Sequence, residues 1–451
     1  MKRLSILTLL CAGSVFAQAP EPLTLDDAVR IGRENSRTLR ISSARVDAAE
    51  GRSGAARAAL LPSLRFEGTY KRLSDVPPFR IQPPGFPSAF VVSPTVLDNY
   101  TSKLTVQQPI FTGFRLSSNA RAAEALAEAS LLDRRSDEED VEVAVTTAYL
   151  TLYQALETMK VTEENVHRLN GFLRDSENLL NAGMATRNDY LKIQLQLNNA
   201  RLQQIDATND VEVARMNLNF VMGRPLDIRV QLVTVPGSGS TTDSTLTRGP
   251  AEAPSSLIDS ALSARPDVRA IEARVQASSA SLTAAQGSWW PQLFLTASYY
   301  YNNPNSRYQP TLALFKSTWD LGVSLQLDLW NWGQTSYEAD QARANLVQSE
   351  TLLAQTKEAI SLDVRRQFLA VRRAVDKVRV ARDGVDQAEE NLRTFADKFQ
   401  NGVATSSDIL DADFSLVQAR TNLTGALVEQ ELADVRMKRA MGVSSDANQN
   451  N

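Results

Sequence analysis

The stretch Asn181-Ala182-Gly183-Met184-Ala185-Thr186 recurs later in the chain as Gln400-Asn401-Gly402-Val403-Ala404-Thr405. The same alignment carries Asp189 onto Asp408, and it extends without a gap over residues 110–223. Self-similarity at a fixed spacing is the signature of a repeated structural unit. The sequence therefore predicts two copies of one fold.

The repeats are bounded by segments of different composition. Residues 1–17 combine two cations, an apolar run and a small-residue cleavage site, which is typical of a secretory signal peptide. We interpret Cys11 as part of that signal rather than as a lipid-attachment site. The other predicted boundaries are 18–234 for the first repeat, 235–256 for a Gly-, Ser-, Thr- and Pro-rich linker, 257–443 for the second repeat and 444–451 for a polar tail.

Each repeat is predicted to begin with a helix, over 25–60 and 257–288, and then to change to strict alternation. In the second repeat the apolar residues occupy every other position between polar ones: Leu321, Val323, Leu325, Leu327 and Leu329. Four such runs of about ten residues have the length of a tilted strand that crosses a bilayer. A soluble sheet with one solvated face is the alternative. The loop over 73–99, rich in proline, is predicted to be long and irregular.

Tryptophan placement favours the membrane interpretation, because interfacial aromatic residues gather at strand ends. All five tryptophans lie at the beginnings or ends of the second repeat's two strands: Trp289, Trp290, Trp319, Trp330 and Trp332.

Long helices follow the strands. Apolar residues step by alternating fours and threes over 141–180 and 360–399, which is the pattern of a coiled coil. It predicts helices over 115–180 and 333–399, each roughly 100 Å long. Shorter helices are predicted to return over 189–222 and 408–441, after glycine turns at Gly183 and Gly402.

Four strands cannot close a barrel, and an open sheet edge is not tolerated in lipid. Two chains would give eight strands and three chains twelve, and three is the smaller number that leaves a channel. The predicted fold class is mainly α, with a duplicated helix-strand-strand-helix-helix unit and a transmembrane β-barrel of twelve strands shared by a trimer.

Composition argues against several functions. One His, one Cys and a net charge of −4 speak against catalysis, metal binding, a cofactor site and nucleic-acid binding. His167 and the acidic run 137–140 are predicted to be solvated helix faces, although the run could line a tunnel.

The duplicated plan, the segments Gln108–Arg115 and Leu329–Gln334, and the two glycine turns together resemble the TolC-type outer-membrane efflux proteins. The resemblance covers nearly the whole mature chain. It implies a trimeric channel in the outer membrane, continuous with a helical tunnel through the periplasm. It also implies docking to a periplasmic adaptor and to an inner-membrane transporter of the RND or ABC type.

The resemblance further implies that the functional residues cluster at the turns. The adaptor would dock at the turn residues Gly183, Met184, Ala185, Thr186, Gly402, Val403, Ala404 and Thr405. Asp408 and Asp411 match positions that form acidic rings at the tunnel entrance, and Asp189 matches a gating aspartate. Plain helix capping is the alternative for these carboxylates, with about equal weight for Asp189.

One departure from the family concerns the gate. This chain has Phe399 and Ala404 where well-known members have a Tyr and an Arg that tie the closed gate, and Arg187 could substitute for them. We therefore predict a gate closed more by packing than by ion pairs. The rival function is a periplasmic coiled-coil adaptor or a structural envelope protein, and the exported substrate is not encoded in these patterns.

Overall fold

A computed structural model describes residues 21–93, 95–233, 254–309 and 311–443. The predicted signal peptide, most of the predicted linker and the predicted tail lie outside these ranges. The described chain forms two compact units, which are treated separately below. The sheet unit comprises residues 42–134 and 266–357, and the helical unit comprises the remaining described residues.

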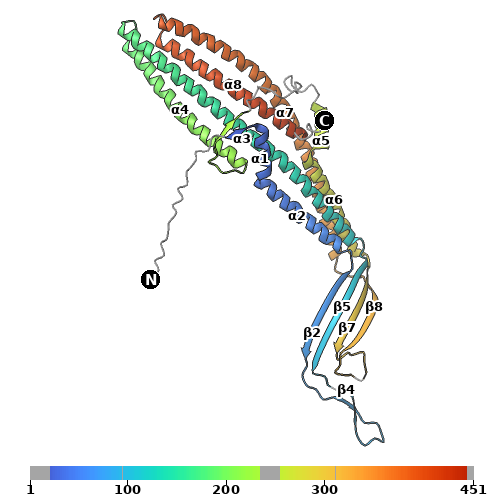
Figure 1. Cartoon of the computed structure of the whole chain (residues 1–451). Coiled ribbons are helices and arrows are strands. Elements are labelled where there is room, and N and C mark those ends of the chain that lie inside the picture. Colours follow the sequence, from blue (N-terminus) through green and yellow to red (C-terminus); the bar gives the residue numbers. More distant parts are fainter. Residues whose placement is uncertain (1–20, 94, 234–253, 310, 444–451) are drawn as a thin grey trace, which may run out of the picture. The chain divides into compact units, whose positions relative to one another are not determined.

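Four antiparallel strands form the sheet, as predicted (Figure 1). They are β2 (Ser63–Arg72), β5 (Asp98–Phe111), β7 (Gln292–Asn303) and β8 (Lys316–Gln326), in the order β2-β5-β7-β8. The central pair β5–β7 joins the two repeats, and β2 and β8 are edges within the described chain. The predicted end of the last strand was wrong, because β8 stops at Gln326 and leaves Leu327 and Leu329 beyond it.

The register of the four strands places the apolar side chains on one face of the sheet. Leu104 lies opposite Phe66 on one side and opposite Tyr299 on the other, and Tyr299 lies opposite Trp319. The apolar face comprises Leu64, Phe66, Tyr70, Tyr100, Leu104, Val106, Leu293, Leu295, Tyr299, Tyr301, Trp319, Leu321, Val323 and Leu325.

This apolar face is exposed, whereas the polar face is exposed along β2 and the end of β8 but partly covered over β7 and the beginning of β8. Leu321 and Val323 are 64% and 66% exposed, whereas the polar neighbours Ser298 and Thr318 on the other face are buried and half-buried. A soluble sheet buries its apolar face, so the distribution is inverted relative to that alternative.

The loop between β2 and β5 was predicted to be irregular, and that prediction was wrong in part. It contains a small antiparallel hairpin, β3 (Phe79–Ile81) and β4 (Phe90–Ser93), with a register irregularity at Phe79 and Arg80. Strands this short, among six prolines, leave no alternating pattern long enough to recognise.

The two long helices are α3 (Arg115–Asn181) and α7 (Gln334–Gln400), each of 67 residues. They are followed by α4 (Arg187–Val221) and α8 (Ser406–Met441), which confirms the predicted order. Every position of the predicted apolar stripes in 141–180 and 360–399 is buried or half-buried, so the heptad interpretation is confirmed. Within the described ranges, no helix combines the length and the apolar character needed to cross a bilayer.

The helix predicted to begin each repeat is instead two helices. In the first repeat α1 (Leu25–Asn35) and α2 (Arg37–Ala58) are separated by Ser36, whose extended backbone ends α1 and whose hydroxyl accepts a bond from the Leu39 N–H at 3.3 Å. Ser36 therefore acts as a cap for α2.

In the second repeat α5 (Pro254–Ala264) and α6 (Pro266–Gln286) are separated by Arg265. Pro266 has no N–H to donate and disfavours a helical conformation at the residue before it. The short 3-10 helix η1 (Gly287–Trp289) follows α6. The predicted linker also extended too far, because its last residues already belong to α5.

A parallel pair of three-residue strands, β1 (Glu21–Leu23) and β6 (Val230–Leu232), was not predicted. Leu23 is buried in a cluster with Val145, Tyr149 and Leu218, and the Tyr149 hydroxyl donates to the Leu23 carbonyl at 3.1 Å. This pair fastens the start of the first repeat to its end.

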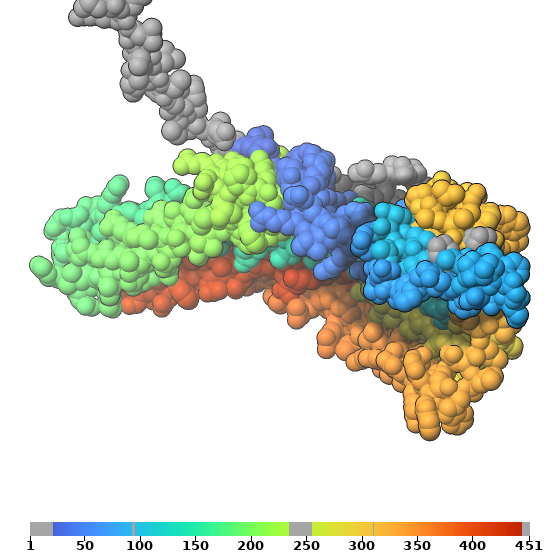
Figure 2. All heavy atoms as spheres, turned by 90° about the horizontal axis from the view of Figure 1, so that it is seen from below, coloured from blue at the N-terminus to red at the C-terminus, as the bar shows by residue number. Residues whose placement is uncertain are grey.

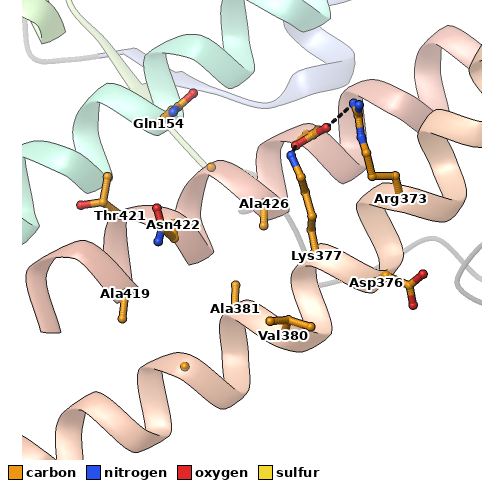
Figure 3. Close-up of a pocket in the computed structure, with 13 residues that line it drawn as sticks. Gln154, Arg373, Asp376, Lys377, Val380, Ala381, Ala419, Thr421, Asn422 and Ala426 are labelled. Carbon is orange, nitrogen blue, oxygen red and sulfur yellow. Dashed lines mark hydrogen bonds and ion pairs between the residues drawn. The ribbon is translucent and has the colours of Figure 1, made fainter. Parts of the chain in front are cut away.

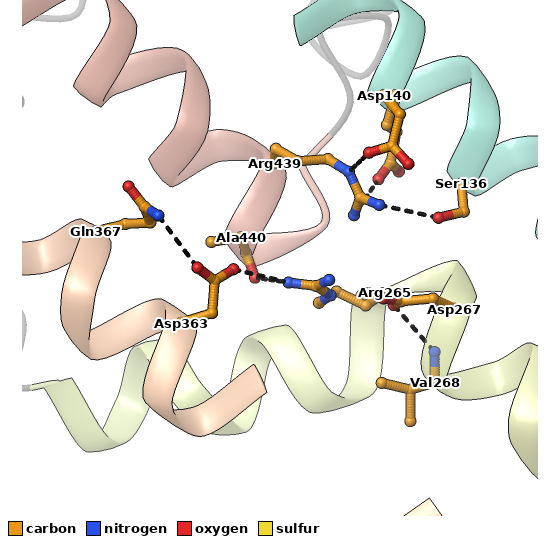
Figure 4. A network of polar contacts seen from close by, with 10 residues as sticks. Ser136, Asp140, Arg265, Asp267, Val268, Asp363, Gln367, Arg439 and Ala440 are labelled. Carbon is orange, nitrogen blue, oxygen red and sulfur yellow. Dashed lines mark hydrogen bonds and ion pairs between the residues drawn. The ribbon is translucent and has the colours of Figure 1, made fainter. Parts of the chain in front are cut away.

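The acidic run 137–140 is not simply solvated, which corrects the prediction. Arg439 Nε donates to Asp140 Oδ1 at 2.8 Å, its Nη2 donates to Ser136 at 2.9 Å, and its Nη1 lies 3.0 Å from Glu139 (Figure 4). Arg439 belongs to the last turn of α8, so the run anchors the end of the second repeat to α3. His167 is exposed, as predicted.

Candidate functional site

The two glycine turns lie at the same end of the helical unit. Figure 2 shows α3 and α4 in green packed beside α7 and α8 in orange to red. In both turns the chain reverses through a left-handed glycine, Gly183 at φ +74° and Gly402 at φ +70°. The next N–H then bonds back to the helix, from Met184 to the Leu179 carbonyl and from Val403 to the Lys398 carbonyl, both at 2.8 Å. We call the two turns, residues 182–189 and 401–408, the first and second tips.

A capping box begins the return helix in each tip. The Thr186 hydroxyl accepts from the Asp189 N–H at 3.2 Å, and Asp189 Oδ2 accepts from the Thr186 N–H at 3.1 Å. Thr405 and Asp408 repeat the arrangement at 3.3 and 2.9 Å. The capping alternative for the two aspartates is therefore observed, which leaves their role in a gate as a prediction.

Asp189 does more than cap its own helix. Its second oxygen, Oδ1, accepts a 2.7 Å bond from the hydroxyl of Ser406, the first residue of α8, and this serine is only 2% exposed. Asp189 thus ties the first tip to the second. Arg187 occupies the position equivalent to Ser406 in the first repeat and is exposed, so Asp408 has no matching tie within the described chain.

Further contacts join the tips. Lys192 Nζ donates to Ser407 at 3.2 Å, and Gln400 donates to Asp175 at 3.2 Å. A Cβ added at Gly402 would lie 2.7 Å from the terminal methyl of Met184, so that methyl packs directly against the second turn.

A hydrophobic cluster supports both tips from behind. It is built from all four helices and comprises Leu169, Phe172, Ile193, Leu197, Ala200, Ala388, Leu392, Phe399, Ile409, Ala412 and Leu416. Phe399 is only 2% exposed, so within one chain it is a core residue of the tips. Arg187 and Asp411 are exposed, and Arg187 forms no ion pair with Asp189 in the described chain.

The electrostatics of the tips follow from these bonds. The Thr186 and Ser406 hydroxyls, in that order, hold the pKa of Asp189 below its ordinary value of 3.8. Thr405 lowers the pKa of Asp408 in the same way. Both carboxylates are therefore charged at neutral pH.

The sequence interpretation missed a buried ion pair near the tips. Asp413 of α8 has a side chain only 3% exposed, and its Oδ1 accepts from Arg168 Nε of α3 at 2.8 Å. Burial raises the pKa of Asp413, while Arg168 opposes that shift. Because the partners lie far apart in sequence, no local pattern could have revealed the pair. Among the described residues, no group of His, Cys, Asp and Glu side chains could hold a metal ion.

The predicted interfacial tryptophans lie in the sheet unit and are all exposed. Trp289 and Trp290 precede β7, and Trp330 and Trp332 follow β8. Trp319 lies inside β8 near its beginning, on the apolar face.

The sequence profile of the outer membrane efflux proteins matches residues 30–224 and 257–443, which are the two repeats. The chain belongs to the outer membrane efflux protein family. Membership confirms the predicted function, an outer-membrane channel for efflux or secretion, and confirms its location. The family consists of channels rather than enzymes.

Individual relatives of this efflux channel are distant in sequence. The outer membrane efflux protein BepC of Brucella suis is 24% identical over 76% of this chain and 72% of its own. The alkaline protease secretion protein AprF of Pseudomonas aeruginosa is 23% identical over 78% of this chain and 71% of its own. The CmeC outer membrane channel of Campylobacter jejuni is 16% identical and superposes with a TM-score of 0.79 over 94% of this chain and 88% of its own. This similarity confirms the predicted fold class.

Proposed function

We propose that three copies of this chain close a twelve-stranded barrel and form a passive duct from the periplasm to the outside. The observation that carries the proposal is the inverted sheet, whose apolar face is exposed and whose edges β2 and β8 pair with no further strand of the described chain. Lipid would cover the apolar face, and β2 of one copy would pair with β8 of the next. The exposed tryptophans would then lie at the membrane interfaces.

The inverted sheet also favours a channel over the rival function. A periplasmic adaptor or a structural envelope protein would account for the long helices. It would not account for an exposed face that carries Trp319, Leu321 and Val323.

The test combines assembly with conductance. Detergent-extracted protein should have the mass of three chains plus detergent, and it should form ion-conducting pores in a planar lipid bilayer. A freely soluble monomer without pore activity would exclude the channel and favour the envelope protein.

We further propose that the tips dock onto a periplasmic adaptor, which connects the duct to an inner-membrane transporter of the RND or ABC type. Met184 and Val403, at corresponding positions of the two turns, are 60% and 75% exposed, although apolar. Exposed apolar side chains on paired turns suit a protein interface. Copurification of an adaptor should fall with Met184→Asp and Val403→Asp together. Val380→Asp serves as the control, because Val380 is exposed in a groove between α7 and α8 and lies outside the tips (Figure 3).

The acidic residues of the second tip are proposed as the selectivity element of the entrance. Threefold repetition would place Asp408 and Asp411 around a narrow axis, where like carboxylates attract cations and repel anions. Asp408→Asn with Asp411→Asn should reduce cation preference, measured as the reversal potential in a KCl gradient. An unchanged reversal potential would remove this role.

A further inference from the structure

The polar face of the sheet carries an excess of cations. It bears Arg65, Lys71, Lys103 and Lys316 against the two carboxylates Glu67 and Asp320. Lys71, Lys103 and Lys316 belong to the half of the sheet next to the β2–β5 and β7–β8 loops, which we call the loop end. None of these three lysines forms an ion pair with a described residue, although Glu67 lies directly opposite Lys103 in the register of β2 and β5.

Two tyrosine rings, those of Tyr300 and Tyr308, lie close to cations of this face. Lys103 Nζ is 5.5 Å from the centre of the Tyr300 ring, and Arg307 Cζ is 6.0 Å from the same centre. Lys316 Nζ is 5.8 Å from the ring centre of Tyr308. Aromatic faces attract cations, so the rings help to hold these side chains in place. The rings leave the charges of Lys103 and Lys316 in place, whereas Arg307 is paired with Asp320.

The β7–β8 loop is folded onto the same polar face. Buried Asn305 donates to the Lys316 carbonyl at 3.0 Å and to the Thr318 hydroxyl at 3.1 Å. Arg307 donates to the Trp319 carbonyl at 2.9 Å and to Asp320 at 3.2 Å. These bonds fix the loop and its guanidinium over the face instead of releasing them to solvent.

We propose that Lys71, Lys103 and Lys316 at the loop end, with Arg307 beside them, form a collar that binds anions carrying phosphate or carboxylate groups. The inference rests on the proposed function, in which the polar face lines the barrel and the loop end faces the outside. Three copies then repeat the collar around one axis, and rings of Lys and Arg favour anions in a pore. The duct would prefer cations at its acidic tips and anions at its outer mouth.

The adjacent residue of β2 supplies a matched control. Lys71 and Arg72 are neighbours, but alternation places Arg72 on the apolar face, where its Nη1 lies 3.0 Å from Asp98. Arg72→Gln removes a cation at the same height of the sheet without changing the collar.

The test measures block by inorganic tripolyphosphate, added to one side of a bilayer that contains oriented channels. Tripolyphosphate on the outer side should reduce the potassium current at lower concentrations than on the tip side. The Lys71→Gln, Lys103→Gln and Lys316→Gln triple variant should raise the half-blocking concentration from the outer side roughly tenfold, because the unpaired charges are removed from every copy. Arg72→Gln should leave it unchanged.

The outcomes separate the two proposals. Pores that conduct but show equal block from both sides, or a triple variant blocked like the wild type, would overturn the collar and leave the duct intact. A wild-type protein that forms no pores would overturn both. If the triple variant fails to assemble, Lys316→Gln and Lys316→Arg decide the matter, since only the first should weaken block from the outer side.

Discussion

At the residue scale, Asp189 forms a bond that plain helix capping does not explain. One carboxylate oxygen caps α4, and the other accepts from Ser406 at the start of α8. A plain cap needs only the first bond. The second makes this aspartate a link between repeats, and it exists because position 406 carries a small hydroxyl where the first repeat carries Arg187.

Ser406→Ala should loosen the second tip. The change removes a buried hydrogen bond to a charged group, which is worth about 1.5–3 kcal/mol, and leaves the Thr186–Asp189 cap in place. Amide hydrogen exchange over residues 401–408 should therefore accelerate roughly tenfold or more. Ser407→Ala is the matched control, because Ser407 is exposed and bonds only a lysine. Equal acceleration in the two variants would deny Ser406 a special role.

Acidification should release the tips. The pKa values of Asp189 and Asp408 are lower in the folded chain than the ordinary 3.8, so their contribution to stability is present above that value and is lost as the pH falls through the folded pKa. Hydrogen exchange in the tips should be insensitive to protonation of these groups from about pH 8 to 5, after correction for the intrinsic rate, and should rise below about pH 3.8. Asp189→Asn should remove part of that rise, and a transition centred near neutral pH would contradict the assignment.

At the element scale, the helices show which structural features a sequence can reveal. The heptad stripes of α3 and α7 run for many turns, so periodicity located these helices, and the repeated glycine turns marked their ends. The breaks at Ser36 and before Pro266 each depend on one residue within a periodic region, and the β1–β6 pair is too short to have a period. The Asp189–Ser406 tie and the Arg168–Asp413 pair join separate elements, and only tertiary structure brings those residues together.

Replacing glycine by alanine should change the free energy of unfolding in opposite directions at a tip and inside a helix. Gly402→Ala should destabilise the helical unit by about 1–2 kcal/mol, because an L-residue is strained at positive φ. The added methyl would also displace the end of Met184. Gly171→Ala is the same substitution inside α3 with open space around it, and it should stabilise by about 0.5–1 kcal/mol. Thermal unfolding followed by helical circular dichroism measures both, and shifts in the same direction would argue against the turn geometry.

At the scale of the whole molecule, the proposed trimer contains six helical hairpins, two from each chain. The two hairpins of one chain have similar folds but different chemistry at their tips. Within the described chain, only the first tip extends a carboxylate to the second. Just beyond the second tip α8 carries the exposed acid Asp411, where α4 has Lys192. The proposed trimer would thus alternate two kinds of tip around its entrance. The proposed outer mouth carries the opposite charge on Lys71, Lys103 and Lys316.

We expect packing at the tips to keep the proposed duct closed. Phe399 is buried among all four tip helices, and replacing a buried Phe by Ala costs about 3–5 kcal/mol. Asp189→Ala removes a cap worth about 0.5–2 kcal/mol together with the Ser406 bond, but it leaves the packed cluster in place. Phe399→Ala should therefore raise the resting single-channel conductance more than Asp189→Ala does. Phe399→Leu, which keeps most of the apolar volume, should behave nearly like the wild type. A many-fold rise with Asp189→Ala would mean that polar ties, rather than packing, keep the entrance closed.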